Sequence, residues 1–163
     1  MGEPRPVELM NTIRADRTGV HDNLDITELR ELRDALRRLA AEVTEDERSA
    51  AASVITDLRT AVEIVNRSSA VAPSWSQLTW PSTRTVHTAH SGNEALVSAI
   101  AEEAIELFTG PEREKLRACG GPGCVLYFVR DHPRREWCSA GCGNRARVAR
   151  HYQRHHSDTN SKA

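Results

Sequence analysis

The most informative segment of the chain is residues 119–156, CGGPGCVLYFVRDHPRREWCSAGCGNRARVARHYQRHH. It holds every cysteine of the 163-residue chain, in two close pairs. Four residues separate the members of the first pair, three separate those of the second, and thirteen lie between the pairs. Such paired spacing is typical of a tetrahedral zinc site, in which each pair supplies two of the four thiolate ligands. The predicted ligands are Cys119, Cys124, Cys138 and Cys142.

Disulfides and unrelated core cysteines are the alternatives to a metal site. No signal peptide precedes the chain, so we expect a reducing, cytoplasmic environment that disfavours disulfides. Four cysteines within 24 residues and none elsewhere do not fit scattered core positions. A closed set of four thiolates leaves no coordination position for a substrate. We therefore predict one structural zinc ion per chain and no catalytic metal.

The residues around the cysteines predict a small finger. Glycines and a proline fill the first pair, where they allow the tight turn of a metal knuckle. The β-branched and aromatic run 125–129 predicts a strand, and 135–137 predicts its return after a break. A helical run over 146–156 follows, in which Val148 and Tyr152 share a face. A knuckle, a hairpin and a helix that starts with the second pair make a treble-clef-like zinc finger.

The letters CGNR at 142–145, preceded by WCS at 137–139 and followed by ARVARHY at 146–152, resemble the CGNR zinc finger of bacterial proteins. Members of that family join the finger to an N-terminal helical domain and are described as stress-induced transcription regulators. The second cysteine pair of the family is usually one residue wider than the pair here, which concerns the local loop more than the metal. The family's N-terminal motif is partly matched at 7–12, and firmly only at Asn11-Thr12.

The two parts of the chain carry opposite charge. Residues 1–118 hold 14 basic and 20 acidic side chains, for a net charge of −6, whereas residues 119–163 hold 8 and 3, for a net charge of +5. A basic finger favours an anionic partner, because phosphate contacts supply most of the affinity of DNA-binding proteins. It could also dock on the acidic domain. The predicted nucleic-acid contacts are Arg134, Arg135, Asn144, Arg145, Arg147, Arg150, His151 and Arg154.

Three residues of the CGNR motif could instead serve the finger itself. Asn144 is a candidate cap of the helix, Arg145 a candidate donor to carbonyls of the knuckle, and Gly143 a position for close packing beside the metal. The arginines farther along the helix would then be the ones that face phosphates.

Residues 1–117 are predicted to form a mainly helical domain. Amphipathic stripes indicate helices over 27–43, 44–66 and 93–109, and a short charged helix is expected over 112–118. The fold class is therefore mainly α with a short β hairpin. It comprises a helical domain at 1–117, a four-cysteine finger at 118–156 and a disordered tail at 157–163. We expect the fragment 1–110 to fold alone, without metal.

Between the second and third helices, Trp75, Leu78 and Trp80 predict a short hairpin or two edge strands, interrupted by Pro81. The two tryptophans could cover the core, which is the favoured interpretation, or line a ligand pocket. Any effector of the domain is expected to bind near them.

The favoured function is a cytoplasmic, stress-related DNA-binding regulator of transcription, whose helical domain senses a signal or forms a homodimer. A zinc-stabilised protein-interaction module and an RNA-binding accessory factor are the alternatives, because a basic treble clef does not distinguish these partners. The sequence shows no phosphate loop, nucleophile motif or open metal site, so we expect no enzymatic activity. No segment is long and apolar enough to span a membrane, and no membrane partner is expected.

Overall fold

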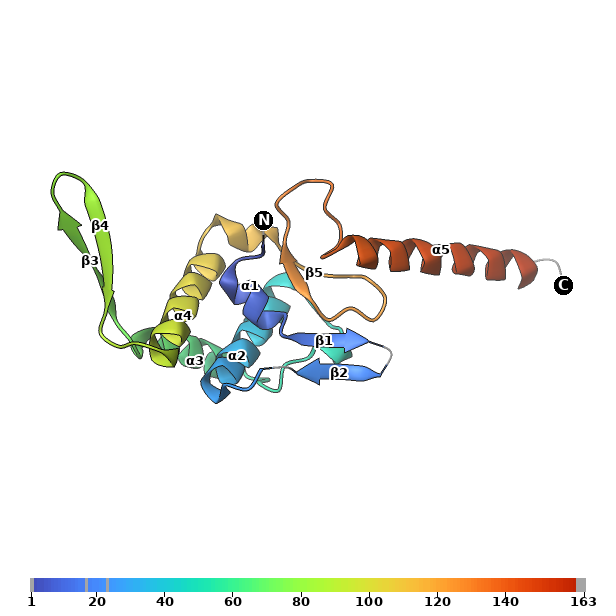
Figure 1. Cartoon of the computed structure of the whole chain (residues 1–163). Coiled ribbons are helices and arrows are strands. Elements are labelled where there is room, and N and C mark those ends of the chain that lie inside the picture. The colour runs from blue at the N-terminus through green and yellow to red at the C-terminus, as the bar shows by residue number, and fades with distance from the viewer. Residues whose placement is uncertain (1, 17, 23, 161–163) are drawn as a thin grey trace.

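The structure is a computed structural model that describes residues 2–16, 18–22 and 24–160, with the side chains of all of these except 155–160. It is mainly helical, with three two-stranded antiparallel sheets (Figure 1). The predicted fold class is confirmed in that a helical region is followed by a four-cysteine cluster. In chain order the elements are α1 (Arg5–Met10), β1 (Ile13–Asp16), β2 (Gly19–Asp22), α2 (Thr27–Thr44), the 3-10 turn η1 (Ser49–Ala51), α3 (Leu58–Ala70), β3 (Ser74–Thr79), β4 (Thr83–Thr88), α4 (Asn93–Thr109), the 3-10 turn η2 (Pro111–Lys115), β5 (Leu116–Ala118), β6 (Tyr127–Val129) and α5 (Ala140–Asn160).

The main core lies between α1, α2, α3 and α4. The helices predicted at 27–43 and 93–109 are confirmed as α2 and α4. The apolar stripe of α2 includes Leu32 and Leu36, which have no exposed surface, and α1 closes the core with Val7. Burial of these side chains is the main stabilising contribution to the fold. The buried members from α3 and α4 are Ala61, Ile64, Val65, Val97, Ile100, Ala101, Ala104 and Leu107.

The helix predicted over 44–66 is wrong in its first half. Glu45 adopts a left-handed conformation with φ of 52°, which ends α2. A loop over 46–57 follows, and α3 begins only at Leu58. The carboxylate of Asp57 caps α3 by accepting a hydrogen bond of 2.7 Å from a backbone N–H of its first turn. Polar side chains in the loop bond to nearby backbone groups, and these bonds compete with helix formation.

The finger shares the main core through β6. Side chains alternate across this strand, so Tyr127 and Val129 lie in the main core with Leu116 of β5, whereas Phe128 packs with the cysteines. The predicted boundary between residues 117 and 118 therefore falls inside β5. The helical part and the finger form one packed unit.

The finger contains a hairpin, but its strands are not the predicted pair at 125–129 and 135–137. β5 and β6 pair in an antiparallel register with Arg117 opposite Phe128, so the first cysteine pair lies in the connection between them. Residues 135–137, which lie in the described part of the chain, form no strand, and the predicted helix at 112–118 is a 3-10 turn followed by β5. Three residues are too few for β5 to show an alternating pattern in the sequence.

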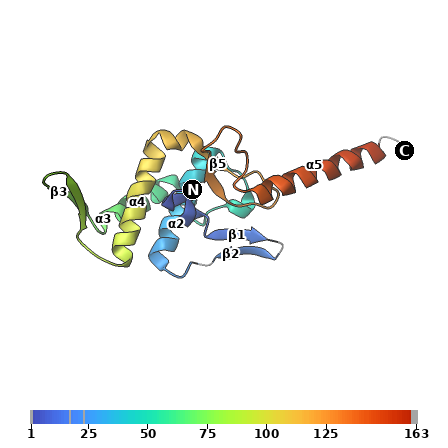
Figure 2. The same cartoon turned by 45° about the horizontal axis from the view of Figure 1, so that its top comes forward.

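The β3–β4 hairpin projects from one end of the body, beside α3 and α4 (Figure 1, Figure 2). The expected hairpin is thus confirmed, but Trp75 and Trp80 are exposed on it and do not cover the core. The reason is that the hairpin extends away from the helices. The ligand pocket expected near the two tryptophans stays a prediction that their exposure does not support.

The helix α5 leaves the body at the opposite end from the hairpin (Figure 1, Figure 2). It extends to Asn160 and so overlaps the predicted tail at 157–163, of which 161–163 lie outside the described residues. A search of the described part of the chain finds no helix that combines the length and the apolar character needed to cross a membrane.

Candidate metal centre and nucleic-acid interface

The four cysteine sulfurs converge on one point. All four Sγ atoms lie within 4.8 Å of one another. The distance is 3.8 Å between Cys124 and Cys138 and 3.4 Å between Cys138 and Cys142. Sulfurs bound about 2.3 Å from a tetrahedral zinc ion lie about 3.8 Å apart. The predicted ligand set therefore fits one structural zinc ion, and the three buried cysteines and the half-buried Cys138 leave no open position for a substrate.

Hydrogen bonds between the thiols couple their protonation. Hydrogen bonds from Cys124 and Cys138 hold the pKa of Cys119 well below its usual range. The hydrogen bond between Cys124 and Cys119 raises the pKa of Cys124 to about 11. The hydrogen bond between Cys138 and Cys119 likewise raises the pKa of Cys138. The sulfurs thus share protons that a divalent cation would displace. Arg145 adds positive charge, since its Nη2 lies 3.0 Å from the sulfur of Cys142.

Two glycines allow close approaches around the sulfurs. A Cβ on Gly121 would lie 3.0 Å from the Cβ of Cys142. A side chain at this position would therefore push the knuckle, residues 119–124, away from α5. A Cβ on Gly143 would lie 3.1 Å from Cδ1 of Trp137. Gly143 therefore makes room for the indole ring, which packs against the cysteines, so the close packing predicted for Gly143 is found.

Two other residues of the CGNR motif differ from their predicted roles. The start of α5 is capped by Ser139, whose Oγ accepts a hydrogen bond of 3.3 Å from the N–H of Cys142. Asn144 is not the cap; it lies in the helix and accepts a hydrogen bond from Arg147. Arg145 bonds to a cysteine sulfur and not to knuckle carbonyls, so its contact is with the metal ligands themselves.

The knuckle carbonyls are bound by Arg48, which the sequence analysis missed. From the loop after α2, its Nη1 donates to the carbonyl oxygens of Cys119 at 2.7 Å and Cys124 at 2.8 Å. The same guanidinium pairs with Asp46 at 2.6 Å, and Asp46 also accepts a hydrogen bond from Tyr127. Burial alone would raise the pKa of Asp46, but these hydrogen bonds outweigh it and lower the pKa. No local pattern marks Arg48, because its partners are 71 and 76 residues away.

A second arginine is buried between the helices and the finger. Arg37 of α2 is 1% exposed. Its guanidinium donates to the carbonyls of Met10 and Ala51 at 2.9 Å each and to that of Val125 at 3.2 Å. It also lies 5.3 Å from the centre of the Tyr127 ring, within range of a cation–π contact. Arg37 therefore ties α1, the loop after α2 and the finger together.

Side chains of the N-terminal segment cover the free edge of β6. Asn11 donates from Nδ2 to the carbonyl of Tyr127 at 2.8 Å and accepts the N–H of Tyr127 at 2.9 Å. Glu3 accepts the N–H of Val129 at 2.9 Å. These bonds satisfy an edge that would otherwise be open to another strand. Asn11, one of the two firm matches to the N-terminal motif, thereby has a structural role.

The two arginines of the insert between the cysteine pairs differ. Arg135 pairs with Glu3, donates to the carbonyl of Val129 at 3.0 Å and lies 4.9 Å from the centre of the Phe128 ring. Its donors are used within the protein, so the structure gives it a role in holding the insert on β6. Arg134 is exposed and remains a predicted nucleic-acid contact.

The remaining predicted contacts lie on α5. Arg147 donates to Asn144, and Nε of Arg150 lies 3.4 Å from the carbonyl of Ala146. Both guanidinium groups therefore lie along the helix surface. The exposed members of the predicted set on α5 are Asn144, Arg145, Arg147, Arg150, His151 and Arg154. The helix thus carries a basic surface beyond the zinc centre.

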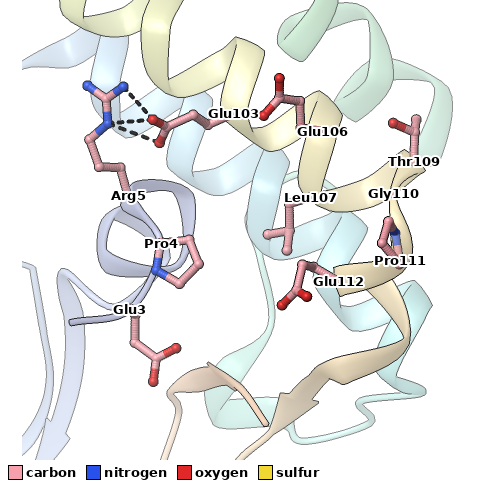
Figure 3. A pocket seen from close by; sticks show the side chains of 10 residues that line it. All are labelled: Glu3, Pro4, Arg5, Glu103, Glu106, Leu107, Thr109, Gly110, Pro111 and Glu112. Atoms are coloured by element: carbon pink, nitrogen blue, oxygen red, sulfur yellow. Dashed lines mark hydrogen bonds and ion pairs between the residues drawn. The ribbon is translucent and has the colours of Figure 1, made fainter. Parts of the chain in front are cut away.

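A groove of about 750 Å³ lies between the start of α1 and the end of α4 (Figure 3). Glu3, Glu103, Glu106 and Glu112 line it together with Arg5. Arg5 pairs with Glu103, with 2.9 Å between Nε and Oε2. Because the charged residues of its lining are four glutamates and one arginine, the groove disfavours phosphate and does not extend the predicted nucleic-acid surface.

Two models of protein families match the chain. The family described as "Putative stress-induced transcription regulator", ABATE, matches residues 9–111. The chain belongs to the ABATE family. A second model, the CGNR zinc finger, matches residues 115–155 and so covers β5, the four cysteines and most of α5. The comparison with curated proteins found no match. In this ABATE protein, the sulfur geometry and the CGNR match together fit one structural zinc ion.

Proposed function

We propose that this protein is a cytoplasmic DNA-binding regulator of transcription, in which the zinc centre holds α5 in position for contact with duplex DNA. The observation that carries the proposal is the projection of α5 from the body (Figure 1). Ala146 is buried near its base, whereas Arg147 and Arg150 are exposed. The family match supports a role in transcription, and the net positive charge of the finger supports an anionic partner.

The dimensions of α5 suit a major groove. Its 21 residues make a helix about 30 Å long, and the major groove of B-DNA, about 12 Å wide, admits an α-helix. Arginines spaced by three and four residues can contact phosphates on either side of the groove or the edges of guanine bases. Because Cys142 lies in the first turn of α5, metal binding fixes the helix at its base.

Fluorescence anisotropy with labelled duplex DNA tests this function. The affinity of the wild-type protein should fall steeply between about 50 and 200 mM salt. Removing Arg147 and Arg150 together (R147A/R150A) should lower the slope of log affinity against log salt by about two units, one for each phosphate contact. Arg59→Ala, an exposed arginine of α3, is the matched control and should leave the slope unchanged. Equal slopes for wild type and R147A/R150A would overturn the proposal.

A protein partner is the second candidate, because α5 also exposes an apolar pair. Val148 and Tyr152 share a face, as predicted, but that face is exposed and not part of a core. Helices that dock into a groove of another protein present such pairs one turn apart. A wild-type protein whose DNA binding is absent or independent of salt would favour this candidate. Duplex RNA in the same assay distinguishes the RNA-binding alternative.

A further inference from the structure

The β3–β4 hairpin is exposed on both faces. Every residue of its strands is exposed except His87, which is half-buried. Within the described residues, neither strand pairs with anything but its hairpin partner. The hairpin reaches away from α3 and α4 in both views (Figure 1, Figure 2). A two-stranded hairpin alone is at best marginally stable in water, so this one needs a further surface.

The exposed side chains of the hairpin include large apolar groups. Leu78, Trp80 and Val86 are 72%, 85% and 57% exposed. Trp75 stacks on His87 with 5.6 Å between the ring centres, yet remains 56% exposed. Leu78 and Val86 lie on one face of the hairpin and Trp75 on the other, so large apolar side chains are exposed on both faces. Large exposed apolar side chains that gather on one element mark an interaction site.

The free edge of β3 lacks the usual protection against pairing. Charged side chains on an edge strand normally prevent contact with other strands. β3 has the sequence SWSQLT, with no charged residue, whereas β4 carries Arg84. Two β4 edges brought together would bring two arginines close, but two β3 edges meet no such repulsion. A two-fold axis between identical chains pairs a strand with itself in the antiparallel direction.

We propose that the β3–β4 hairpin is a dimerisation arm, which joins two copies of this chain by pairing β3 with β3 of the second copy in a four-stranded sheet. Because β3 carries no charged side chain, it suits pairing with a second copy of this chain better than pairing with a charged partner. The arm offers few charges to a nucleic acid or a charged protein, whereas its uncharged edge and apolar side chains complement themselves. The tryptophans that the sequence analysis assigned to a ligand pocket are then anchors of the interface.

The available apolar area is of the right order for a dimer. A tryptophan buries about 150–250 Å², so exposures of 56% and 85% leave roughly 200–350 Å² of tryptophan surface on each arm. Two arms offer at most roughly 400–700 Å² of tryptophan surface toward the ~1,200–2,000 Å² that a stable interface buries. Leu78, Val86 and the paired strands add to this area.

The position of the arm leaves the finger accessible. Because the arm and α5 lie at opposite ends of the body, pairing through β3 would leave both zinc centres and both basic helices uncovered (Figure 1). The proposed dimer does not depend on DNA binding and can be tested without DNA.

Sedimentation equilibrium of the zinc-loaded full chain tests the dimer. We expect the wild type to show a monomer–dimer equilibrium. Leu78→Glu, which places like charges in the paired sheet, and Trp80→Ser, which removes an anchor, should each weaken dimerisation by about tenfold or more. Tryptophan emission should shift to shorter wavelength as the wild-type concentration rises, and this shift should be lost in both variants.

Val54→Glu is the matched control, because Val54 is an equally exposed apolar residue in the loop before α3, outside the arm. It should dimerise like the wild type. Circular dichroism and zinc content should be unchanged in all three variants; if Leu78→Glu fails this check, Trp80→Ser supplies the same measurement. A wild type that stays monomeric at every concentration overturns the proposal, as does a dimer that neither arm variant weakens.

Discussion

The hydroxyl of Tyr127, on the strand after the first cysteine pair, donates a hydrogen bond of 2.7 Å to the carboxylate of Asp46, which lies 81 residues earlier in the loop after α2. Burial, followed by this hydrogen bond, raises the pKa of Tyr127 well above its usual range, so the hydroxyl keeps the proton that it donates. Arg37 and Arg48 lie 5.3 and 5.5 Å from the centre of its ring. A change on either side of this contact is therefore expected to reach both the helices and the zinc finger.

Tyr127→Phe removes the hydroxyl and keeps the ring. The free energy of unfolding should fall by about 1.5–3 kcal/mol, because a hydrogen bond to a charged, buried acceptor is lost. Urea unfolding of the zinc-loaded protein measures the change. Tyr152→Phe, at an exposed position on α5, should change stability by less than about 0.5 kcal/mol. If both variants unfold at the wild-type urea concentration, the contact with Asp46 contributes no stability.

Arg48→Met should speed the loss of zinc. The variant removes both hydrogen bonds to the carbonyls of Cys119 and Cys124, so the knuckle is held less firmly. Contacts that orient metal ligands affect metal affinity by about 10–100-fold, and transfer of zinc to a coloured chelator measures the effect. Arg67→Met removes a surface ion pair with Glu31 and should leave the rate unchanged. Equal rates in both variants would contradict the role of Arg48.

Asp46 should make stability depend on pH in the acid range. Its pKa in the folded protein lies below the unfolded value of about 3.9. The stability that it contributes is therefore fully present above that unfolded value and is lost as the pH falls through the folded pKa. Asp46→Asn should lower stability near neutral pH and flatten the loss below about pH 4.

Acid also protonates the zinc-binding thiolates, but it does so in both proteins. The quantity to compare is therefore the difference in unfolding free energy between Asp46→Asn and the wild type at each pH. A difference that stays constant from neutral to acid pH would show that the carboxylate does not titrate as expected.

The fragment 1–110 should not fold independently, contrary to the expectation from the sequence. It lacks Leu116, Tyr127 and Val129, which are all buried in the main core. Burial of a large apolar side chain contributes about 1.5–3 kcal/mol, so the fragment loses roughly 5–9 kcal/mol. This loss is comparable with the whole stability of a typical domain. Circular dichroism should show a broad thermal transition, and a sharp one would restore the view of two independent domains.

Loss of zinc should lower the thermal stability of the whole chain. Cys124→Ser should unfold the finger, because metal binding supplies its folding free energy. The helices were predicted to form a separate domain, but Tyr127 and Val129 connect the finger to their core. Calorimetry of the wild type with and without chelator, and of Cys124→Ser, checks this. A melting temperature of the helical part that chelation leaves unchanged would argue against the shared core.

The zinc ligands were predictable because the spacing of paired cysteines reports a metal site directly. α2 and α4 were predictable because each has a long amphipathic stripe. The loop after α2 was not, because side-chain bonds to the backbone end one helix and delay the next. β5 was too short to show a pattern, which is why the wrong partner was assigned to β6.

The contacts between helices and finger could not be read from the sequence. Arg37, Arg48 and Asn11 bind partners that are distant in the chain, and nothing in their local surroundings distinguishes them from solvent-exposed residues. The same reason explains why the pair between Arg135 and Glu3 was not predicted, and the nucleic-acid contact of Arg135 stays a prediction. The sequence shows that a segment is basic, but only the fold shows whether a given arginine forms its ion pairs and hydrogen bonds within the protein.

The side chain of Asn11 offers Tyr127 one carbonyl and one N–H, the same two groups as a peptide unit of the backbone. The side chain of Asn11 therefore takes the place of a paired backbone residue on this edge of β6, where Glu3 also accepts the N–H of Val129. A slip of β6 by one residue would turn Tyr127 toward the zinc centre and Phe128 toward the helices. Asn11 and Glu3 thus favour the register in which the finger docks. Aspartate has nearly the same shape but no N–H, so it would keep the fit at this position and lose the donor half of the pairing that holds the register.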